Sequence, residues 1–353
     1  MSVKITKAET SKLAEVDFDN LVFGKKFSDH MFVMEYNNGK WQEPTIVPFA
    51  DFSISPANMT IQYAQTIFEG MKAYRTQDGK VNIFRPERHA KRINYSARRM
   101  CIPEVDPDVF VEALHEFVNL DREWVPKKRG DALYLRPFIF GDDAALGLSV
   151  SKTYKFVIIG TPVSMYYKEG LNPISLMTSG EYARAGPGGV GDAKAGGNYG
   201  ASLYATHEAM KKGYSQVLWL DGCAHKYVEE VGTMNIFFVF GNELVTPSLD
   251  GTILGGLTRE CVIAIAKEWG YAVTERKLTI DEVMAGAEDG TLTEAFGTGT
   301  AVVIAPVGTI AHNDKTVTIN DNKTGEFSQK IYDELCAIRY GEKEDRYGWN
   351  YII

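Results

Sequence analysis

A single lysine stands within a glycine-rich run, residues 188–200, of this 353-residue chain. The run holds six glycines, so its backbone can bend sharply and few side chains cover the amine of Lys194. A flexible surface loop would have the same composition. A phosphate-binding P-loop needs Ser or Thr directly after Gly-Lys, and Ala193 and Ala195 at the flanking positions exclude it. A third interpretation is an amine that forms a Schiff base with a carbonyl cofactor.

Such an amine needs a carboxylate for a ring nitrogen and a site for a phosphate, and the second half of the chain offers candidates. Glu229 and Glu230 follow a strand pattern, and adjacent residues of a regular strand point to opposite faces, so one of them could face a site. Two glycines precede a helix that begins near Thr258, and residues 296–301 form a Gly/Thr turn, which gives two candidate anion nests. Each feature alone also has an ordinary structural explanation.

One arginine interrupts an apolar strand pattern over residues 132–140. An arginine in a buried strand needs an anionic or polar partner. Arg136 is therefore either paired within the structure or directed at a ligand, and the pattern leaves both open.

The composition limits the class of protein. Hydrophobic residues make up 44% and charged residues 24% of the chain, as in ordinary globular proteins, and the net charge of -8 argues against nucleic-acid binding. The four cysteines lie far apart and the histidines show no metal-ligand spacing, so we expect no metal site. No signal core or membrane-length apolar stretch is present, which favours a cytoplasmic protein.

The chain length predicts two domains of about 150 residues each. We expect a smaller N-terminal domain over residues 1–160, a linker over 161–171 that is rich in Gly and Pro, and a larger C-terminal domain over 172–353. Periodicity and turn signals predict two hairpins, around Asp78-Gly79 and Asp221-Gly222. The expected helices cover residues 86–100, 107–120, 199–213 and a stretch ending near 269.

Five blocks, in the same order, together resemble the branched-chain amino acid aminotransferases, pyridoxal-phosphate enzymes of fold type IV. The blocks are residues 68–72, 134–137, 188–200, 230–237 and 297–301. The resemblance implies a mixed α+β and α/β fold of two domains, with the cofactor at the domain interface, and at least a homodimer. Mammalian members carry a redox-active CxxC after the last block, where this chain has Val302 and Ala305, so we expect no thiol switch.

The same resemblance implies a cofactor site. Lys194 matches the Schiff-base lysine and proton shuttle, Tyr199 the phenol that hydrogen-bonds the ring oxygen, and Glu230 the partner of the ring nitrogen, whereas Glu229 receives no such role. Five further positions match family residues that contact the phosphate or another part of the cofactor: Arg92, Thr233, Leu257, Thr258 and Thr300.

The substrate site follows from the resemblance as well. Tyr63, Phe68 and Tyr134 match an aromatic wall for leucine, isoleucine and valine side chains. Arg136 is the candidate donor for the second carboxylate of glutamate, and backbone amides of Thr300 and Ala301 are candidates for the α-carboxylate. In this family, two further residues of one subunit contribute to the substrate pocket of the neighbouring subunit. The matching positions in this chain are Leu146 and Leu148.

The implied reaction is reversible transamination between branched-chain L-amino acids and 2-oxoglutarate, with pyridoxal 5′-phosphate as cofactor and no metal. A D-amino acid aminotransferase and an aminodeoxychorismate lyase share the fold, but blocks 134–137 and 230–235 resemble the branched-chain branch. A non-catalytic protein with a relic site would be expected to have lost the lysine, the carboxylate or the arginine, and all three are present.

Overall fold

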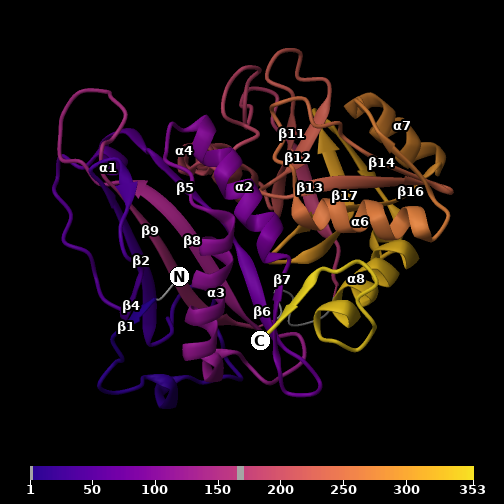
Figure 1. Ribbon diagram of the computed structural model, residues 1–353. Helices are drawn as coiled ribbons and strands as arrows, with labels where there is room; N and C mark the ends of the chain where they lie inside the picture. Colours follow the sequence, from indigo (N-terminus) through magenta and orange to yellow (C-terminus); the bar gives the residue numbers. More distant parts are fainter. Residues whose placement is uncertain (1–2, 165–170) are drawn as a thin grey trace. The chain divides into compact units, whose positions relative to one another are not determined.

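The structure, a computed structural model, describes residues 3–164 and 171–353, which form two compact units. Unit 1 comprises Met1–Tyr166, Ala193–Gly197 and Cys336–Ile353, and unit 2 comprises Tyr167–Asp192 and Asn198–Leu335. In Figure 1 the indigo-to-magenta chain and the yellow C-terminal end belong to unit 1, and most of the orange chain belongs to unit 2.

This division differs from the expected one in two places. The C-terminal segment groups with unit 1 because strand β19 (Asn350–Ile352) pairs with β7 (Val81–Phe84), and because Asn82 Nδ2 donates to the carbonyl of Arg339 at 2.8 Å. Residues 193–197 of the glycine run also group with unit 1. Most of the expected linker, 161–171, falls on residues 165–170, outside the described residues.

Unit 1 is built on a sheet with the strand order β1-β4-β2-β9-β8-β6-β7-β19, with β3 on β2 and β5 on β8. Its neighbours are antiparallel except for the β1–β4 pair. The remaining strand bounds are β1 Lys4–Ile5, β2 His30–Asn37, β3 Lys40–Trp41, β4 Thr45–Pro48, β5 Thr66–Phe68, β6 Met71–Arg75, β8 Ala132–Gly141 and β9 Tyr154–Val163. The β6–β7 hairpin confirms the turn expected at Asp78-Gly79.

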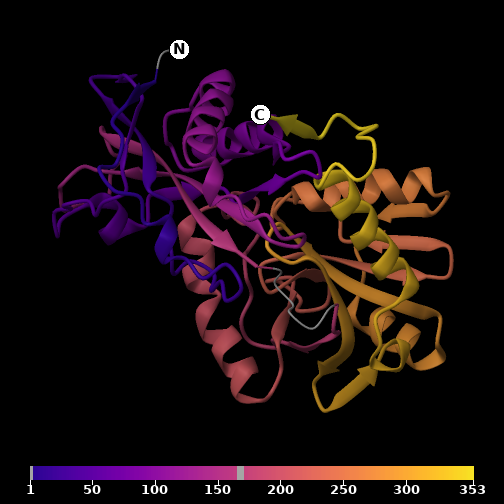
Figure 2. The same cartoon turned by 90° about the horizontal axis from the view of Figure 1, so that it is seen from below.

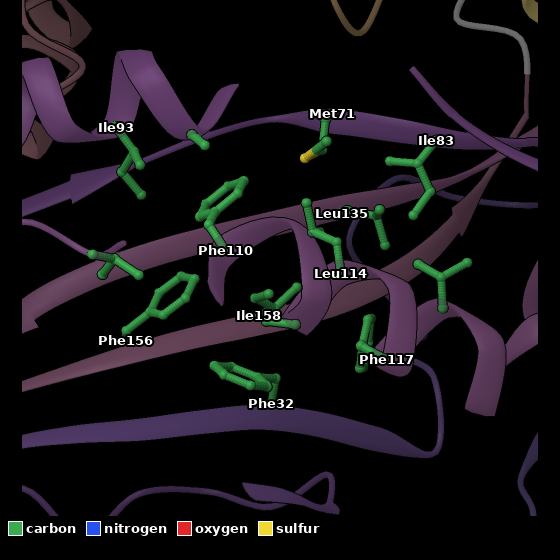
Figure 3. Close-up of a cluster of buried hydrophobic side chains, with 14 of the residues drawn as sticks. Phe32, Met71, Ile83, Ile93, Phe110, Leu114, Phe117, Leu135, Phe156 and Ile158 are labelled. Carbon is green, nitrogen blue, oxygen red and sulfur yellow. The ribbon is translucent and has the colours of Figure 1, made fainter. Parts of the chain in front are cut away.

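Two helices, α2 (Pro86–Arg99) and α3 (Pro107–Leu120), pack on this sheet. Each begins with a proline at its first turn, and the Asp106 side chain caps α3 by accepting from the amide of Asp108. Figure 3 shows their apolar stripes meeting strand residues such as Leu135 and Phe156. A short helix, α1 (Met59–Tyr63), precedes β5.

Unit 2 contains a second sheet with the order β12-β11-β10-β17-β16-β13-β14-β15, and β18 pairs with β17. The strand bounds are β10 Ile174–Thr178, β11 Gln216–Leu220, β12 Val228–Val231, β13 Asn235–Phe240, β14 Glu243–Thr246, β15 Ala272–Glu275, β16 Leu292–Gly299, β17 Val303–His312 and β18 Lys315–Thr318. The antiparallel β11–β12 pair confirms the second expected hairpin.

The helices that remain are α4 (Gly196–Ala201), α5 (Leu203–Lys211), α6 (Leu257–Glu268), α7 (Ile280–Asp289) and α8 (Glu326–Arg339). One helix was expected over 199–213, but the structure divides it into α4 and α5 at Ser202. In Figure 2 the yellow α8 runs along the orange strands of unit 2, where Phe327 stacks on Phe296 of β16. Within the described parts of the chain, no helix is both long and apolar enough to cross a membrane.

Candidate active site

Lys194 is held at both of its backbone polar groups within unit 1. Its amide donates to Ser96 Oγ of α2 at 2.9 Å, and its carbonyl accepts from the amide of Phe68 at 3.0 Å. The next residue, Ala195, forms a β-bridge with Ile67 of β5. The backbone of Lys194 therefore pairs with β5, which excludes a flexible loop at this position. The Nζ of Lys194 lies 4.9 Å from the centroid of the Phe68 ring.

A buried carboxylate orients Arg92 in the same unit. Glu69 is fully buried, and it accepts from Nε and Nη2 of Arg92 at 2.7 Å each and contacts Nδ1 of His89 at 2.7 Å. Burial alone would raise the pKa of Glu69, but the charges and hydrogen bonds of Arg92 and His89 outweigh it and hold that pKa well below its usual range. This bidentate contact with Glu69 fixes the plane of the Arg92 guanidinium.

The sequence analysis did not single out Glu69, although it lies in the block of residues 68–72. The available signal was a glutamate between an apolar strand residue and a glycine, which is unusual at a buried position.

Phe68, Tyr134 and Arg136 form one group on β5 and β8. The Arg136 guanidinium lies 4.6 Å from the centroid of Phe68, and its Nη2 donates to the Tyr134 hydroxyl at 3.0 Å. That hydroxyl lies over Gly70, where a Cβ would collide with it, so the block requires glycine there. Among the described residues, Arg136 Nε has no hydrogen-bond partner.

Tyr63 is tied to the loop that carries the two expected inter-subunit leucines. Its hydroxyl accepts from the amide of Gly147 at 2.9 Å. Leu146 and Leu148, on either side of that glycine, are 76% and 83% exposed.

Unit 2 contains a pocket lined by Arg184, Asn198, Tyr199, Ser202, Glu230, Gly232 and Thr233. Glu230, on β12, is buried, and its two carboxylate oxygens have different partners. Oε1 accepts from the amide of Leu254 at 2.8 Å, and Oε2 lies 3.0 Å from Nε of Arg184. Thr233 lies in the turn between β12 and β13. The structure thus brings together three of the expected cofactor residues: Tyr199, Glu230 and Thr233.

The neighbouring glutamate is not among the residues that line this pocket. Glu229 is also buried, and its Oε1 accepts from the hydroxyl of Thr252 at 2.5 Å. Burial raises the pKa of Glu229, and the charges of Asp250 and Glu230 act in the same direction, whereas Thr252 and Arg184 oppose the shift. The two adjacent carboxylates therefore differ in place and in partners.

The two expected anion nests occupy defined positions in unit 2. Leu257 and Thr258 are the first residues of α6, whose N-cap, Gly256, has an extended backbone and supplies no side-chain cap. Thr300 and Ala301 form the turn between β16 and β17. A helix start without a side-chain cap favours an anion because of its amides and its dipole.

The expected site residues are thus divided between the two units. Unit 1 holds Tyr63, Phe68, Arg92, Tyr134, Arg136, Leu146, Leu148 and Lys194. Unit 2 holds Tyr199, Glu230, Thr233, Leu257, Thr258, Thr300 and Ala301.

Residues 66–310 match the family model of amino-transferase class IV. The chain therefore belongs to the class IV aminotransferases. It is 49% identical over 341 residues to branched-chain-amino-acid aminotransferase 2 of Bacillus subtilis, an alignment that covers 96% of this chain and 94% of that protein. This similarity identifies the chain as a member of the branched-chain-amino-acid aminotransferases and confirms the expected family.

Two solved structures show the same fold. The branched-chain aminotransferase from Thermoproteus uzoniensis with norvaline has a TM-score of 0.75 and 27% sequence identity, over 92% of this chain and 99% of that chain. A branched-chain amino acid aminotransferase complexed with N-(5′-phosphopyridoxyl)-L-glutamate, from a T.th. strain, has a TM-score of 0.72 and 28% identity, over 90% and 97%. These similarities confirm the mixed, two-domain fold of type IV and the expected cofactor, pyridoxal phosphate.

The donor set of unit 2 fits this cofactor. A pyridoxal ring needs an anionic acceptor for its protonated nitrogen, and the pocket offers one buried carboxylate, Glu230, in a fixed orientation. The phenol of Tyr199 lines the same pocket.

Proposed function

We propose that this protein transfers the amino group of L-leucine, L-isoleucine or L-valine to 2-oxoglutarate, reversibly, giving the branched-chain 2-oxo acid and L-glutamate. The similarity to a branched-chain aminotransferase over 96% of the chain carries the proposal. The pocket of unit 2, with a buried carboxylate and a phenol among its lining residues, supports it independently.

Bound pyridoxal phosphate supplies an electron sink and carries the amino group between the two half-reactions. Lys194 would hold the cofactor covalently through Nζ; once the substrate amine has displaced Nζ, the freed amine would carry the proton from the substrate α-carbon to C4′ of the cofactor. Its backbone is fixed to Ser96 and Phe68, so the amine starts from a defined place rather than from a mobile loop.

Glu230 would accept a hydrogen bond from the protonated ring nitrogen, and Tyr199 would donate one to the phenolic oxygen of the ring. The charge of Glu230 stabilises the protonated nitrogen, which withdraws electrons from the reacting carbon. Four residues hold the phosphate: Arg92, Leu257, Thr258 and Thr300. Thr233 contacts the cofactor from the turn after β12.

The substrate is held by the aromatic residues Tyr63, Phe68 and Tyr134, with α-carboxylate contacts from the amides of Thr300 and Ala301. An apolar wall separates side chains that differ by one methylene by only about 1–3 kcal/mol, so one site can accept all three branched-chain substrates. The Nε of Arg136, which lacks a partner among the described residues, is a donor available to the second carboxylate of glutamate.

The working unit in this proposal is a cytoplasmic homodimer. The high exposure of Leu146 and Leu148 supports this assembly because a partner subunit would cover both side chains. Analytical ultracentrifugation tests the dimer: double substitution of the leucines by serine should shift the protein towards monomer, and an unchanged dimer would contradict their role.

Chemical trapping tests the proposed function. Borohydride reduction of the cofactor-loaded protein should attach pyridoxyl phosphate to the peptide that contains Lys194. Lys194→Ala should lose both the label and transamination, whereas Lys80→Ala, at an exposed hairpin lysine, should keep both. Label on another lysine, or full activity in Lys194→Ala, would refute the proposal.

A further inference from the structure

Arg184 connects three segments of unit 2. It is 9% exposed and lies between β10 and the glycine run. Its Nη2 donates to the carbonyl of Gly191 at 2.8 Å and also to the carbonyl of Thr252. Its Nε lies 3.0 Å from Oε2 of Glu230, an ion-pair contact that lacks hydrogen-bond geometry. One side chain thus contacts the glycine run, the loop before α6 and the pocket carboxylate.

The glycine run is packed tightly where Arg184 binds it. A Cβ on Gly191 would lie 2.5 Å from the Cβ of Ala185 and 2.5 Å from the carbonyl oxygen of Thr252. Real Cβ atoms do not approach other atoms so closely, so the position requires glycine. At the residue before Gly191, the carbonyl of Val190 accepts a hydrogen bond from Nδ2 of Asn198 at 2.8 Å. This part of the run is therefore anchored.

The loop over residues 252–254 closes the arrangement. The carbonyl of Thr252 accepts a hydrogen bond from Arg184, and the hydroxyl of Thr252 donates one to Glu229. The amide of Leu254 donates a hydrogen bond to Glu230. The guanidinium, two adjacent carboxylates and the loop form one connected network, which the sequence analysis did not identify. Because Arg184 donates to the glycine run at the carbonyl of Gly191 and pairs with Glu230, its loss should weaken the connection between the run and the carboxylate.

We propose that Arg184 is a positioning residue, whose guanidinium holds the Glu230 carboxylate towards the pocket and anchors the glycine run three residues before Lys194. The inference rests on the proposed function in taking Glu230 as the partner of the ring nitrogen. Although Arg184 lines the pocket, in this role it acts through Glu230 and the glycine run. A planar, five-donor guanidinium can hold a carboxylate and two carbonyls together, which a lysine ammonium cannot do in the same geometry.

Hydrogen exchange of the cofactor-free protein tests the anchoring without any turnover. In Arg184→Gln, the amide of Leu254 and the amides of residues 188–193 should exchange about tenfold faster or more, as expected when a charge-assisted hydrogen bond is lost. Arg75→Gln is the matched control, because Nη2 of Arg75 also donates to two backbone carbonyls, those of Arg122 and Val125, but lies in unit 1. It should leave these amides unchanged. Unchanged exchange in Arg184→Gln would overturn the proposal.

Kinetics provide the second measurement. Arg184→Gln should lower kcat by about 10–100-fold, the range known for residues that orient a metal ligand, with a KM for L-leucine within about threefold of the parent value. Arg184→Lys should recover part of kcat, because it keeps the ion pair, but not the slow exchange of residues 188–193. A merely structural role predicts lower thermal stability with kcat preserved in the folded fraction, and that result would overturn the proposal.

Glu230→Gln separates a failure of this inference from a failure of the proposed function. If Glu230→Gln loses activity while Arg184→Gln keeps normal kcat and normal exchange, the positioning role is wrong and the proposed function stands. If Glu230→Gln is fully active, the proposed function is wrong at this residue, and the role of Arg184 at Glu230 is overturned with it.

Discussion

Substitution of the two adjacent glutamates by glutamine should have opposite outcomes. Glu230 lines the pocket and pairs with Arg184 at 3.0 Å, whereas Glu229 bonds to Thr252 outside the set of lining residues. The two substitutions make the same chemical change at neighbouring positions of β12 and preserve side-chain volume. They therefore compare the two places of the carboxyl group in the structure.

The structure gives a magnitude for each variant. Glu230→Gln removes the negative partner of a ring nitrogen, and loss of one preorganised electrostatic group costs about 2.7–4 kcal/mol, or roughly 10²–10³-fold in kcat. It also leaves Arg184 buried without its ion-pair partner, which should lower the free energy of unfolding by about 3–5 kcal/mol. Glu229→Gln resembles the protonated glutamate that burial favours, so kcat should stay within about threefold.

The pH dependence of stability gives a second signature. The folded protein holds the proton of Glu229 more tightly than the unfolded chain does, so this residue's contribution to stability is complete below the ordinary glutamate pKa and is lost as the pH rises through the raised pKa. Glu229→Gln should remove that loss and be at least as stable as the parent protein at pH 8. Urea unfolding at several pH values measures it.

Single-turnover absorbance with L-leucine is the kinetic assay, and each variant is first saturated with pyridoxal phosphate. A Glu230→Gln rate within threefold of the parent rate, or a hundredfold loss in Glu229→Gln, would refute the assignment of the two carboxylates.

Three further predictions follow from buried or cationic groups. Glu69→Gln should weaken binding of pyridoxal phosphate about tenfold or more, because Arg92 loses its charged partner and one of its two acceptor oxygens. Quenching of tryptophan fluorescence measures the affinity, and an unchanged affinity would contradict the role of Arg92. Burial lowers the pKa of Lys72 to about 7, so the folded protein binds fewer protons than the unfolded chain between about 7 and 10.5, and stability should rise with pH over that window. Lys72→Met should lose this rise and gain about 1–4 kcal/mol at pH 7 in urea unfolding, and a retained slope would assign it to another group. Arg136→Met should raise the KM for L-glutamate at least tenfold and change that for L-leucine less than threefold, and equal effects on both would refute a selective carboxylate contact.

The sequence predicted most local elements because their signals are local. The hairpin turn at Asp78-Gly79 and the proline that opens α3 are set by backbone preferences within a few residues, and the structure has both. Helix α3 begins and ends at the predicted residues, Pro107 and Leu120. The interpretation of Lys194 as a presented amine rather than a loop residue needed the family resemblance, since composition alone fitted both.

The features that the sequence did not predict depend on contacts between distant segments. Strand β19 joins β7 across more than 250 residues, and no local pattern near the C-terminus specifies that partner. The partners of Arg184 are a neighbouring carbonyl and two residues far along the chain, and Glu69 binds helix residues 20 and 23 positions away. A charged residue at a buried position must have a partner, but the amino-acid sequence does not identify that partner.

The most direct test of the central claim is the visible absorbance of the cofactor-loaded protein when L-leucine is added without any 2-oxo acid. The band of the lysine-bound cofactor should fall while that of pyridoxamine phosphate grows, and 2-oxoglutarate should then restore the original band. A protein that binds pyridoxal phosphate but shows no change with L-leucine, or responds only to a D-amino acid, would contradict branched-chain transamination.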